Sequence, residues 1–404
     1  MANKKNAFTF FCLYIAQTIP TSFFSTVIPV IMRQENFTLT EIGMLQLIKF
    51  PWVFKFLWSP IVDRYSTSIN DYKRWIFSSE LIYAVIVFSV AFLDLKTSTH
   101  MVLALIALSF IASATQDIAT DALAALTFSK KNKVVVNSMQ SMGRFGGTLI
   151  GSGLLLILFR KVGGWDSLLP FLALFVIIAL LPLFFNKKLV IQQEKSENVK
   201  RADWTDIFSF FDRKSILKQI GFLLLYYTPI IGSLAMLRPY LVDLGYDMKQ
   251  IGIMSGVVGT AAGMLASFLA GFIVRKIGRY YSRILFAVFI LVTPIYFYMI
   301  SLNAVPDIQS LYFGIIMLWG SYGMASVVVN TTAMDCVRTG REGTDFTIQT
   351  VLTHTSGIGI VILSGKIADK LGYSNLFLFA FCLAALSLIY ILTVFKREQY
   401  AKPI

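Results

Sequence analysis

Histidine and cysteine are scarce in this chain, which holds two histidines and three cysteines among 404 residues. The cysteines show no paired or CxxC spacing, and His100 and His354 lie far apart in the sequence. We therefore expect no metal site, no cofactor and no disulfide framework. An HExxH motif and a cluster of acids with histidines are also absent, which disfavours a membrane-embedded enzyme. No sizeable soluble domain is present to favour a receptor.

Charged residues are also scarce. Charged residues make up 14% of the chain, against about 25% in soluble domains. Hydrophobic residues make up 56%, and 35 residues are phenylalanine. This composition is typical of a polytopic protein that has the lipid bilayer as a partner. The net charge of +14 does not indicate a nucleic-acid partner, because the basic residues gather in short loops between apolar runs.

Long apolar runs predict the membrane spans. A bilayer core is roughly 30 Å thick, so a helix needs about 20 mostly apolar residues to cross it. About twelve windows meet this criterion, which predicts an all-α membrane protein with both termini on one side. The windows are 8–32, 41–62, 75–94, 101–127, 133–159, 168–187, 215–240, 249–274, 282–302, 309–334, 345–365 and 375–395. The first lacks an A-x-A cleavage site and is expected to remain as a membrane helix.

Lysine and arginine are distributed unevenly between the two sides of these spans. Cytoplasmic loops carry the excess of basic residues in membrane proteins. The loops on the side of the N-terminus hold Lys4, Lys5, Arg64, Lys73, Arg74, Lys130, Lys131, Lys133, the cluster from Lys187 to Lys218, Arg275 to Arg283, Arg338, Arg341, Lys396, Arg397 and Lys402. We therefore expect both termini in the cytoplasm.

The longest polar segment, 186–214, falls between the sixth and seventh windows. It predicts two pseudo-symmetric six-helix bundles, 1–187 and 215–404, with a cytoplasmic linker at 188–214. The linker is either a flexible connection or a regulatory module. Short matches recur at one offset of 209 residues, which favours duplication and a transporter architecture. The matches are Pro20 with Pro229, Thr40–Leu45 with Lys249–Met254, and Gln140 with Gln349.

Two aspartates in the span 101–127 are the first candidate functional residues. Ionisable side chains within spans are costly and rarely face lipid. Asp117 and Asp121 are four residues apart and share one helix face, with Gln116 and Thr120 alongside. Burial raises the pKa of a carboxyl and a nearby cation lowers it, so Asp117 is expected to gain and lose a proton during function. Asp121 either shares that role or bonds a loop or a neighbouring helix end.

Basic side chains lie within other spans. Lys49 and Arg144 are too deep to reach the interface easily, so they serve either a function or a static ion pair with Asp117. Lys55 lies near the end of its helix, where we expect it to extend to the inner interface. His354 lies at mid-depth in its span. The glycines of 143–153 and 256–263 are expected to let helices pack closely.

Two motifs suggest a family. The segments "KFPWVFKFLWSPIVDRY" (Lys49–Tyr65) and "SATQDIATDA" (Ser113–Ala122) resemble signature segments of AmpG-type muropeptide permeases. That group lies within the peptide/acetyl-coenzyme A transporter branch of the major facilitator superfamily. "SPIVDRY" also resembles the superfamily's loop motif, with Asp63 and Arg64 at its acidic and basic positions, although Ser59 replaces the usual leading glycine. The chain resembles single-component siderophore permeases of this branch equally well.

The resemblance implies a monomeric importer of the inner membrane that takes a bulky anionic solute by alternating access, coupled to protons, with sodium as the alternative ion. A muropeptide is the first expected cargo and a ferric siderophore the second. Under this hypothesis Asp117 and Asp121 take the proton, and Lys55, Asp63 and Arg64 gate the cytoplasmic side. The residues expected to contact the solute are Lys49, Arg144, His354, Gln116, Gln140, Asn330 and Gln349. A drug or metabolite exporter is the rival within transport, disfavoured because the glycine-rich fifth span has no proline.

Overall fold

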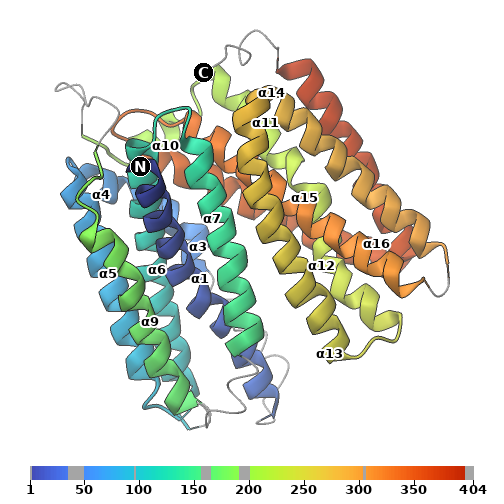
Figure 1. Ribbon diagram of the computed structural model, residues 1–404, viewed down its shortest axis with the longest axis horizontal. Coiled ribbons are helices and arrows are strands. Elements are labelled where there is room, and N and C mark those ends of the chain that lie inside the picture. The colour runs from blue at the N-terminus through green and yellow to red at the C-terminus, as the bar shows by residue number, and fades with distance from the viewer. Residues whose placement is uncertain are drawn as a thin grey trace. The chain divides into compact units, whose positions relative to one another are not determined.

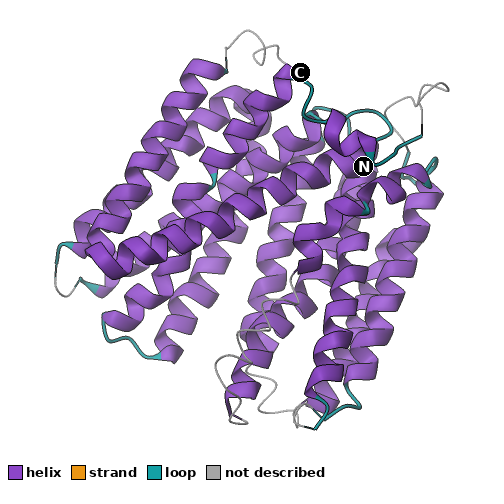
Figure 2. Ribbon diagram, turned by 180° about the vertical axis from the view of Figure 1, so that it is seen from behind, coloured by secondary structure: helices purple, strands orange, loops and turns teal. Residues whose placement is uncertain are grey.

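The computed structural model describes residues 2–34, 50–94, 97–155, 165–190, 201–303 and 306–395. All the secondary structure in these ranges is helical (Figure 1, Figure 2). The chain divides into two compact units, each built from several segments. Unit 1 takes Met1–Ser129, Gly146–Ser209 and Val337–Val351, and unit 2 takes Lys130–Phe145, Phe210–Cys336 and Leu352–Ile404. Each unit therefore draws on both halves of the sequence, and the division into two six-helix bundles stays a prediction.

Unit 1 is a bundle of long helices with several short turns. Helix α5 packs against α6 and α9, and α1 packs against α9, α6 and the π-helical turn η3. Its apolar core includes Phe23, Phe24, Val87, Phe110 and Val176. The elements are α1 (Ala2–Gln34), α3 (Phe50–Phe54), η2 (Lys55–Leu57), α4 (Ser59–Arg64), α5 (Ile69–Val90), α6 (Thr99–Thr127), η3 (Leu149–Leu154), α9 (Trp165–Phe185) and α10 (Thr205–Ser209).

The predicted span 41–62 is described only from Phe50 onwards, and there it is not one continuous helix. A 3₁₀ turn, η2, separates α3 from α4, and Pro60 stands at the start of α4. Proline suits the first turn of a helix because its missing N–H would have no partner there. All three short elements pack on α6. The break therefore presents several side chains of this segment to α6.

Unit 2 is organised around a long helix pair, α14 and α15. Its elements are α7 (Lys133–Thr148), α11 (Lys214–Tyr226), α12 (Thr228–Asp243), α13 (Met248–Ile251), the π-helical η4 (Gly252–Gly259), α14 (Thr260–Ser301), α15 (Ile308–Asp335) and α16 (Glu342–Val394). The last residues of α7, from Gly146, and the first residues of α16, up to Val351, belong to unit 1.

Seven stretches of the described residues are long and apolar enough to cross a membrane. Two of them, Lys249–Ser301 and Glu342–Val394, are 53 residues long. At 1.5 Å per residue each would extend about 80 Å, far more than a bilayer core. Each is broken by a glycine with positive φ, Gly278 at 79° and Gly372 at 82°. These breaks suit two crossings per stretch, and the count of twelve spans remains a prediction.

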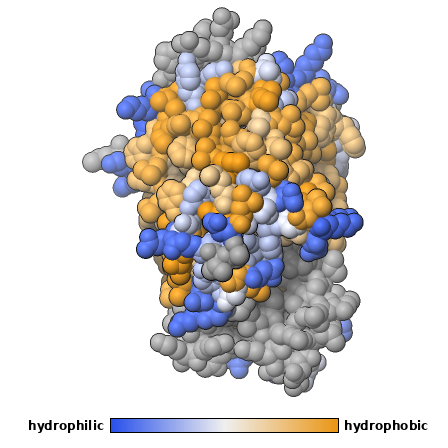
Figure 3. All heavy atoms as spheres, turned by 90° about the vertical axis from the view of Figure 1, so that its right-hand side faces the viewer, coloured by the Kyte–Doolittle hydropathy of each residue, from blue (hydrophilic) through white to orange (hydrophobic). Residues whose placement is uncertain are grey.

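Large apolar side chains lie on the outer faces of these helices. Figure 3 shows a wide hydrophobic area with hydrophilic residues gathered around it. Exposed examples on α14 and α16 are Leu265, Phe272 and Ile362. A water-soluble protein rarely exposes a large contiguous apolar patch, so these faces fit a lipid environment.

The predicted close approach of glycines is confirmed within unit 1. A methyl group added at Gly147 would lie 2.6 Å from Cβ of Thr18, and one at Gly151 would overlap the carbonyl oxygen of Ile19. Glycine therefore lets α1 lie directly against the end of α7 and η3. In the second stretch, 256–263, which lies in unit 2, a methyl group added at Gly263 would lie 2.9 Å from the ring of Phe145, whereas nothing lies within 4 Å of one at Gly256.

Candidate functional site

A buried ion pair lies at the centre of unit 1. The Lys55 ammonium donates to Oδ2 of Asp117 at 2.5 Å, and the amide nitrogen of Gln17 donates to Oδ1 at 2.8 Å. The side chains of Lys55 and Asp117 are 1% and 0% exposed. Trp52 lies with its ring 5.2 Å from the Lys55 nitrogen, which adds a cation–π contact. The expectation that Lys55 extends to the interface is wrong, because the turn η2 directs it to α6 instead.

Asp121 lies one helical turn beyond Asp117 and is bonded separately. The hydroxyl of Tyr14 donates to its Oδ1 at 2.6 Å, and Asp121 is 1% exposed. Gln17 and Tyr14 are three residues apart on α1, so one face of α1 contacts both aspartates. The two carboxylates on α6 thus share a face, as their spacing predicts.

Tyr14 and Gln17 were not among the candidates from the sequence. Gln17 carried a usable signal, since a glutamine within an apolar run is as unusual as Gln116. Tyr14 carried none, because tyrosine is common in membrane helices.

The other candidates are distributed between the two units. Gln116 on α6 and Gln349 on the first part of α16 are buried in unit 1. Lys49 lies outside the described residues. In unit 2, Gln140 and Asn330 are buried, Arg144 is half-buried and His354 is exposed. That these residues line one cavity stays a prediction.

Arg144 lies next to a group of aromatic side chains in unit 2. Its charge acts on the hydroxyl groups of Tyr227 and Tyr322. The ring of Phe145 meets Trp319 and Tyr322 edge-on, with centroids 6.1 and 5.5 Å apart. A guanidinium close to tyrosine hydroxyls can bind carboxylate and sugar groups.

Asp63 caps the N-terminus of α16 within unit 1. Its Oδ1 accepts the backbone N–H of Gly343 at 3.0 Å, and its Oδ2 accepts both the N–H and the hydroxyl of Thr344 at 2.7 Å. The hydroxyl of Tyr72 donates to Oδ1 at 3.3 Å. The first N–H groups of a helix lack internal partners and favour an acceptor that carries negative charge.

The acidity of Asp63 reflects opposing effects. Burial raises its pKa to about 7, and the nearby charge of Glu342 acts in the same direction. The hydrogen bonds from Thr344 and Gly343 lower the pKa in part. Arg64, the basic residue of the motif, is exposed, with its Nη1 3.9 Å from Oδ1 of Asp203.

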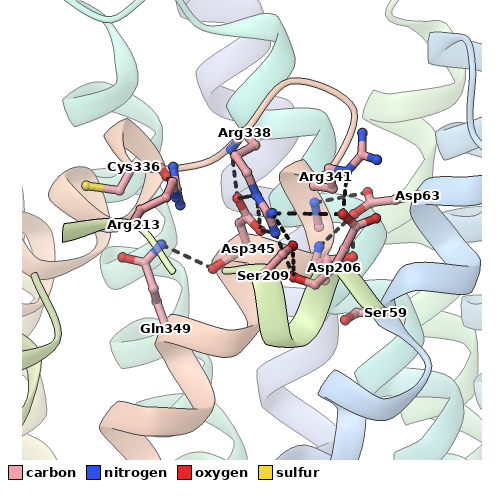
Figure 4. Close-up of polar contacts among 12 residues, drawn as sticks. Ser59, Asp63, Asp206, Ser209, Arg213, Cys336, Arg338, Arg341, Asp345 and Gln349 are labelled. Carbon is pink, nitrogen blue, oxygen red and sulfur yellow. Dashed lines mark hydrogen bonds and ion pairs between the residues drawn. The ribbon is translucent and has the colours of Figure 1, made fainter. Parts of the chain in front are cut away.

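An arginine–aspartate network joins the segment before α16 to the short helix α10 (Figure 4). Arg338 Nη2 donates to Oδ1 of Asp345 at 2.6 Å and to the carbonyl oxygen of Asp206 at 2.8 Å, while its Nη1 donates to the hydroxyl of Ser209 at 2.8 Å. Arg341 lies 3.0 Å from Oδ1 of Asp206. In the sequence these arginines served only as topology markers, because nothing there pairs them with 206 or 345.

The charge of Asp206 is favoured by this network. Partial burial alone would raise its pKa, but the hydrogen bond from Arg341, the N–H of Asp203 and the charges of Arg341 and Arg338 together hold the pKa below its ordinary value. The indole N–H of Trp204 also donates to the carbonyl oxygen of Leu57 at 2.8 Å. The described end of the predicted linker is therefore bonded to unit 1 at several points.

Buried charges paired between the helices of a polytopic protein are characteristic of membrane transporters. The chain belongs to the Major Facilitator Superfamily, whose family model matches residues 7–360. It is a multi-pass transporter of the inner membrane and not an enzyme.

Its relatives include muropeptide permeases. The chain is 21% identical to the anhydromuropeptide permease of Escherichia coli (strain K12), over 96% of this chain and 80% of the permease. It is 25% identical to putative transporter AmpG 3 of Rickettsia prowazekii (strain Madrid E), over 92% of each chain. The resemblance to AmpG-type permeases drawn from the two sequence motifs is thus confirmed.

Solved structures share the fold. A bacterial homologue of the iron transporter ferroportin in the outward-facing state matches with a TM-score of 0.71 at 15% identity, over 96% of this chain and 98% of that chain. The human organic anion transporter MFSD10 matches with a TM-score of 0.72 at 14% identity, over 96% and 99%. At this identity the likeness concerns the fold alone.

Proposed function

We propose that this transporter imports a bulky anionic solute, an anhydromuropeptide first, by proton-coupled alternating access. In the proposed topology twelve spans form two six-helix bundles with both termini in the cytoplasm. The observation that carries the proposal is the buried ion pair of Lys55 with Asp117.

Proton binding to Asp117 is the proposed coupling step. Ionised Asp117 is stabilised by Lys55 and by the amide of Gln17. Once Asp117 is protonated, the Lys55 ammonium is buried without a balancing charge, which is strongly unfavourable. Protonation therefore favours a conformation in which Lys55 reaches water or an anionic group of the solute. A proton taken up from one side and released to the other would drive this change.

The proposed solute site combines cations with neutral hydrogen-bonding groups. Arg144, with Tyr227 and Tyr322 within reach of its charge, would bind a carboxylate of the solute. Lys49 and His354 would add positive charge, while Gln116, Gln140, Asn330 and Gln349 would bind sugar and amide groups. A muropeptide carries carboxylate, sugar and amide groups. One relative, which aligns with 96% of this chain, is an anhydromuropeptide permease.

Gating is proposed to involve Asp63. Its bonds to Gly343 and Thr344 join a first-half residue to the start of α16. Opening of the cytoplasmic side would break these bonds, with Arg64 and Lys55 moving on the same segment.

Uptake into right-side-out proteoliposomes with an imposed inward proton gradient tests the proposal. An anhydromuropeptide and a ferric siderophore are supplied in parallel to wild type, Asp117→Asn and the control Asp212→Asn, which alters an exposed carboxylate. A further variant, Lys55→Met with Asp117→Asn, removes both charges and leaves none unbalanced.

We expect gradient-driven accumulation of the muropeptide in wild type and control, and its loss in both Asp117 variants while binding persists. Accumulation that is unchanged in Asp117→Asn would refute the coupling role. Accumulation of the siderophore alone would replace the cargo, and accumulation of neither would reject both cargoes while leaving the family assignment in place.

A further inference from the structure

Glu80 is a buried carboxyl group that the proposed transport mechanism does not use. It lies on α5, about 16 Å along the axis from the first residue of the helix at 1.5 Å per residue. Its side chain is 0% exposed. The buried residues Tyr72, Ile76, Tyr83 and Val87 lie on the same face of α5, so Glu80 points into the bundle and not towards lipid.

Neither oxygen of Glu80 has a hydrogen-bond partner among the described residues. The other buried carboxylates of unit 1 differ in this respect. Asp117 accepts from Lys55, Asp121 from Tyr14, Asp63 from the start of α16, Asp345 from Arg338, and Glu342 from the backbone N–H of Gly340. Glu80 alone lacks both a cation and a donor within the described part of the unit.

The described helices that pack most extensively against α5 supply no compensating charge. These helices are α6 and α9. The titratable groups of α6 are His100 at its start and the two aspartates already bonded to α1 and η2, and α9 carries only Asp166 in its first turn. On α5 itself, the nearest ionisable group is the Tyr83 hydroxyl, which is also buried. An ionised carboxylate without partners is very unfavourable in such surroundings, and the group binds a proton instead.

We propose that Glu80 is a second proton-binding residue, distinct from the ion pair of Asp117. In the described conformation it is a neutral carboxylic acid. When α5, α6 and α9 rearrange during transport, the O–H bond of this acid breaks, the proton passes to water, and the carboxylate that remains takes up a proton before the helices pack again. Its transport role rests on the proposed proton coupling, whereas its protonated state does not.

Infrared spectroscopy of the purified transporter in lipid vesicles tests the protonated state without any cargo. A protonated buried carboxyl gives a C=O stretching band that shifts when D₂O replaces H₂O. We expect a component of this band at neutral pH in wild type and in Asp212→Asn, and the loss of that component in Glu80→Gln. Asp63 is also a buried carboxyl, and its pKa is about 7. The spectrum of Asp63→Asn therefore identifies the component that belongs to Asp63, so that it is not mistaken for the component of Glu80. Wild-type and Glu80→Gln spectra that are identical in this region would overturn the proposal.

Transport separates a coupling role from a structural one. Glutamine matches the size and neutrality of the protonated acid, so Glu80→Gln should keep the wild-type melting temperature and the exchange of solute without a gradient. It should lose gradient-driven accumulation. Accumulation with the wild-type pH dependence would refute the coupling role. If wild type accumulates no cargo, the proposed function fails, while the infrared band and its D₂O shift still decide whether Glu80 binds an exchangeable proton.

Discussion

Lys55 and Asp117 are 62 positions apart in the sequence, yet they form a fully buried ion pair with 2.5 Å between Nζ and Oδ2. The pair connects the short turn η2 to the middle of α6. Residues 50–64 do not form one continuous α-helix, because the 3₁₀ turn at Lys55–Leu57 interrupts it. The break in the helix and the buried charge of Lys55 are therefore parts of one arrangement.

Loss of one partner of this pair should be far more harmful than loss of both. Lys55→Met leaves Asp117 without its cation, and removal of one partner of a buried pair costs about 3–5 kcal/mol. The double variant Lys55→Met with Asp117→Asn leaves no unpaired charge and should recover most of that loss. Thermal unfolding in detergent of the single and double variants measures the difference. Equal destabilisation by the single and double variants would show that packing, and not charge balance, governs this position.

The sequence predicted one side of this pair better than the other. Asp117 and Asp121 were predicted as a pair on one face, because helical spacing is a local property. Lys49 and Arg144 were the cations that the sequence offered as ion-pair partners of Asp117, whereas Lys55 was expected at the interface, because sequence spacing does not show which side chains meet inside a bundle. Only the tertiary packing of η2 on α6 selects Lys55.

A side chain at Gly343 should lower the stability of the protein. An added Cβ would lie 2.9 Å from Oδ1 of Asp63 and 3.1 Å from Cγ2 of Ile118. Asp63 cannot simply move, because it also accepts two bonds from Thr344. Gly343→Ala should therefore destabilise the protein by about 1–3 kcal/mol, as overpacking does. The melting temperature measures this effect.

Gly359 provides the matched control on the same helix. No atom lies within 4 Å of a Cβ added there, so Gly359→Ala should be neutral or stabilise by up to about 1 kcal/mol through helix propensity. A similar loss of stability in both variants would contradict the close contact at Asp63.

Asp63 should make stability depend on pH near neutrality. Its folded-state pKa of about 7 lies above its ordinary value of 3.8, so the folded chain binds this proton more tightly than the unfolded chain does. The stabilising contribution is complete below the ordinary value and is lost as pH rises through about 7. Melting temperatures across this range should fall with rising pH in wild type and should fall less in Asp63→Asn. Parallel curves for the two proteins would exclude Asp63 as the titrating group.

The segment around α10 marks the limit of what the sequence could predict. Composition predicted a polar linker, and the motif "SPIVDRY" singled out Asp63 as a candidate. Neither could identify Arg338 or Asp206 as partners, because their contact depends on how residues 337–351 return to unit 1. Charge patterns predict the side of the membrane, and only the folded chain shows which charges pair.

Arg338 should hold α10 in place. It binds Asp345, which is 0% exposed, together with Ser209 and the carbonyl oxygen of Asp206. Hydrogen bonds to a charged group contribute about 1.5–3 kcal/mol each. Arg338→Ala leaves Arg341 to bind Asp206, and the double variant with Arg341→Ala removes that contact as well.

Limited trypsin digestion measures the release of this helix, since Arg201 and Arg213 lie on either side of it. Cleavage should be faster in Arg338→Ala and fastest in the double variant. Arg74→Ala is the control, because the Arg74 side chain is 84% exposed and pairs only with Asp71 on its own helix among the described ion pairs. Cleavage at the wild-type rate in the double variant would mean that the bond from Trp204 to the Leu57 carbonyl suffices to hold α10. The arginines would then serve to neutralise Asp345 and Asp206, and would not fasten the linker.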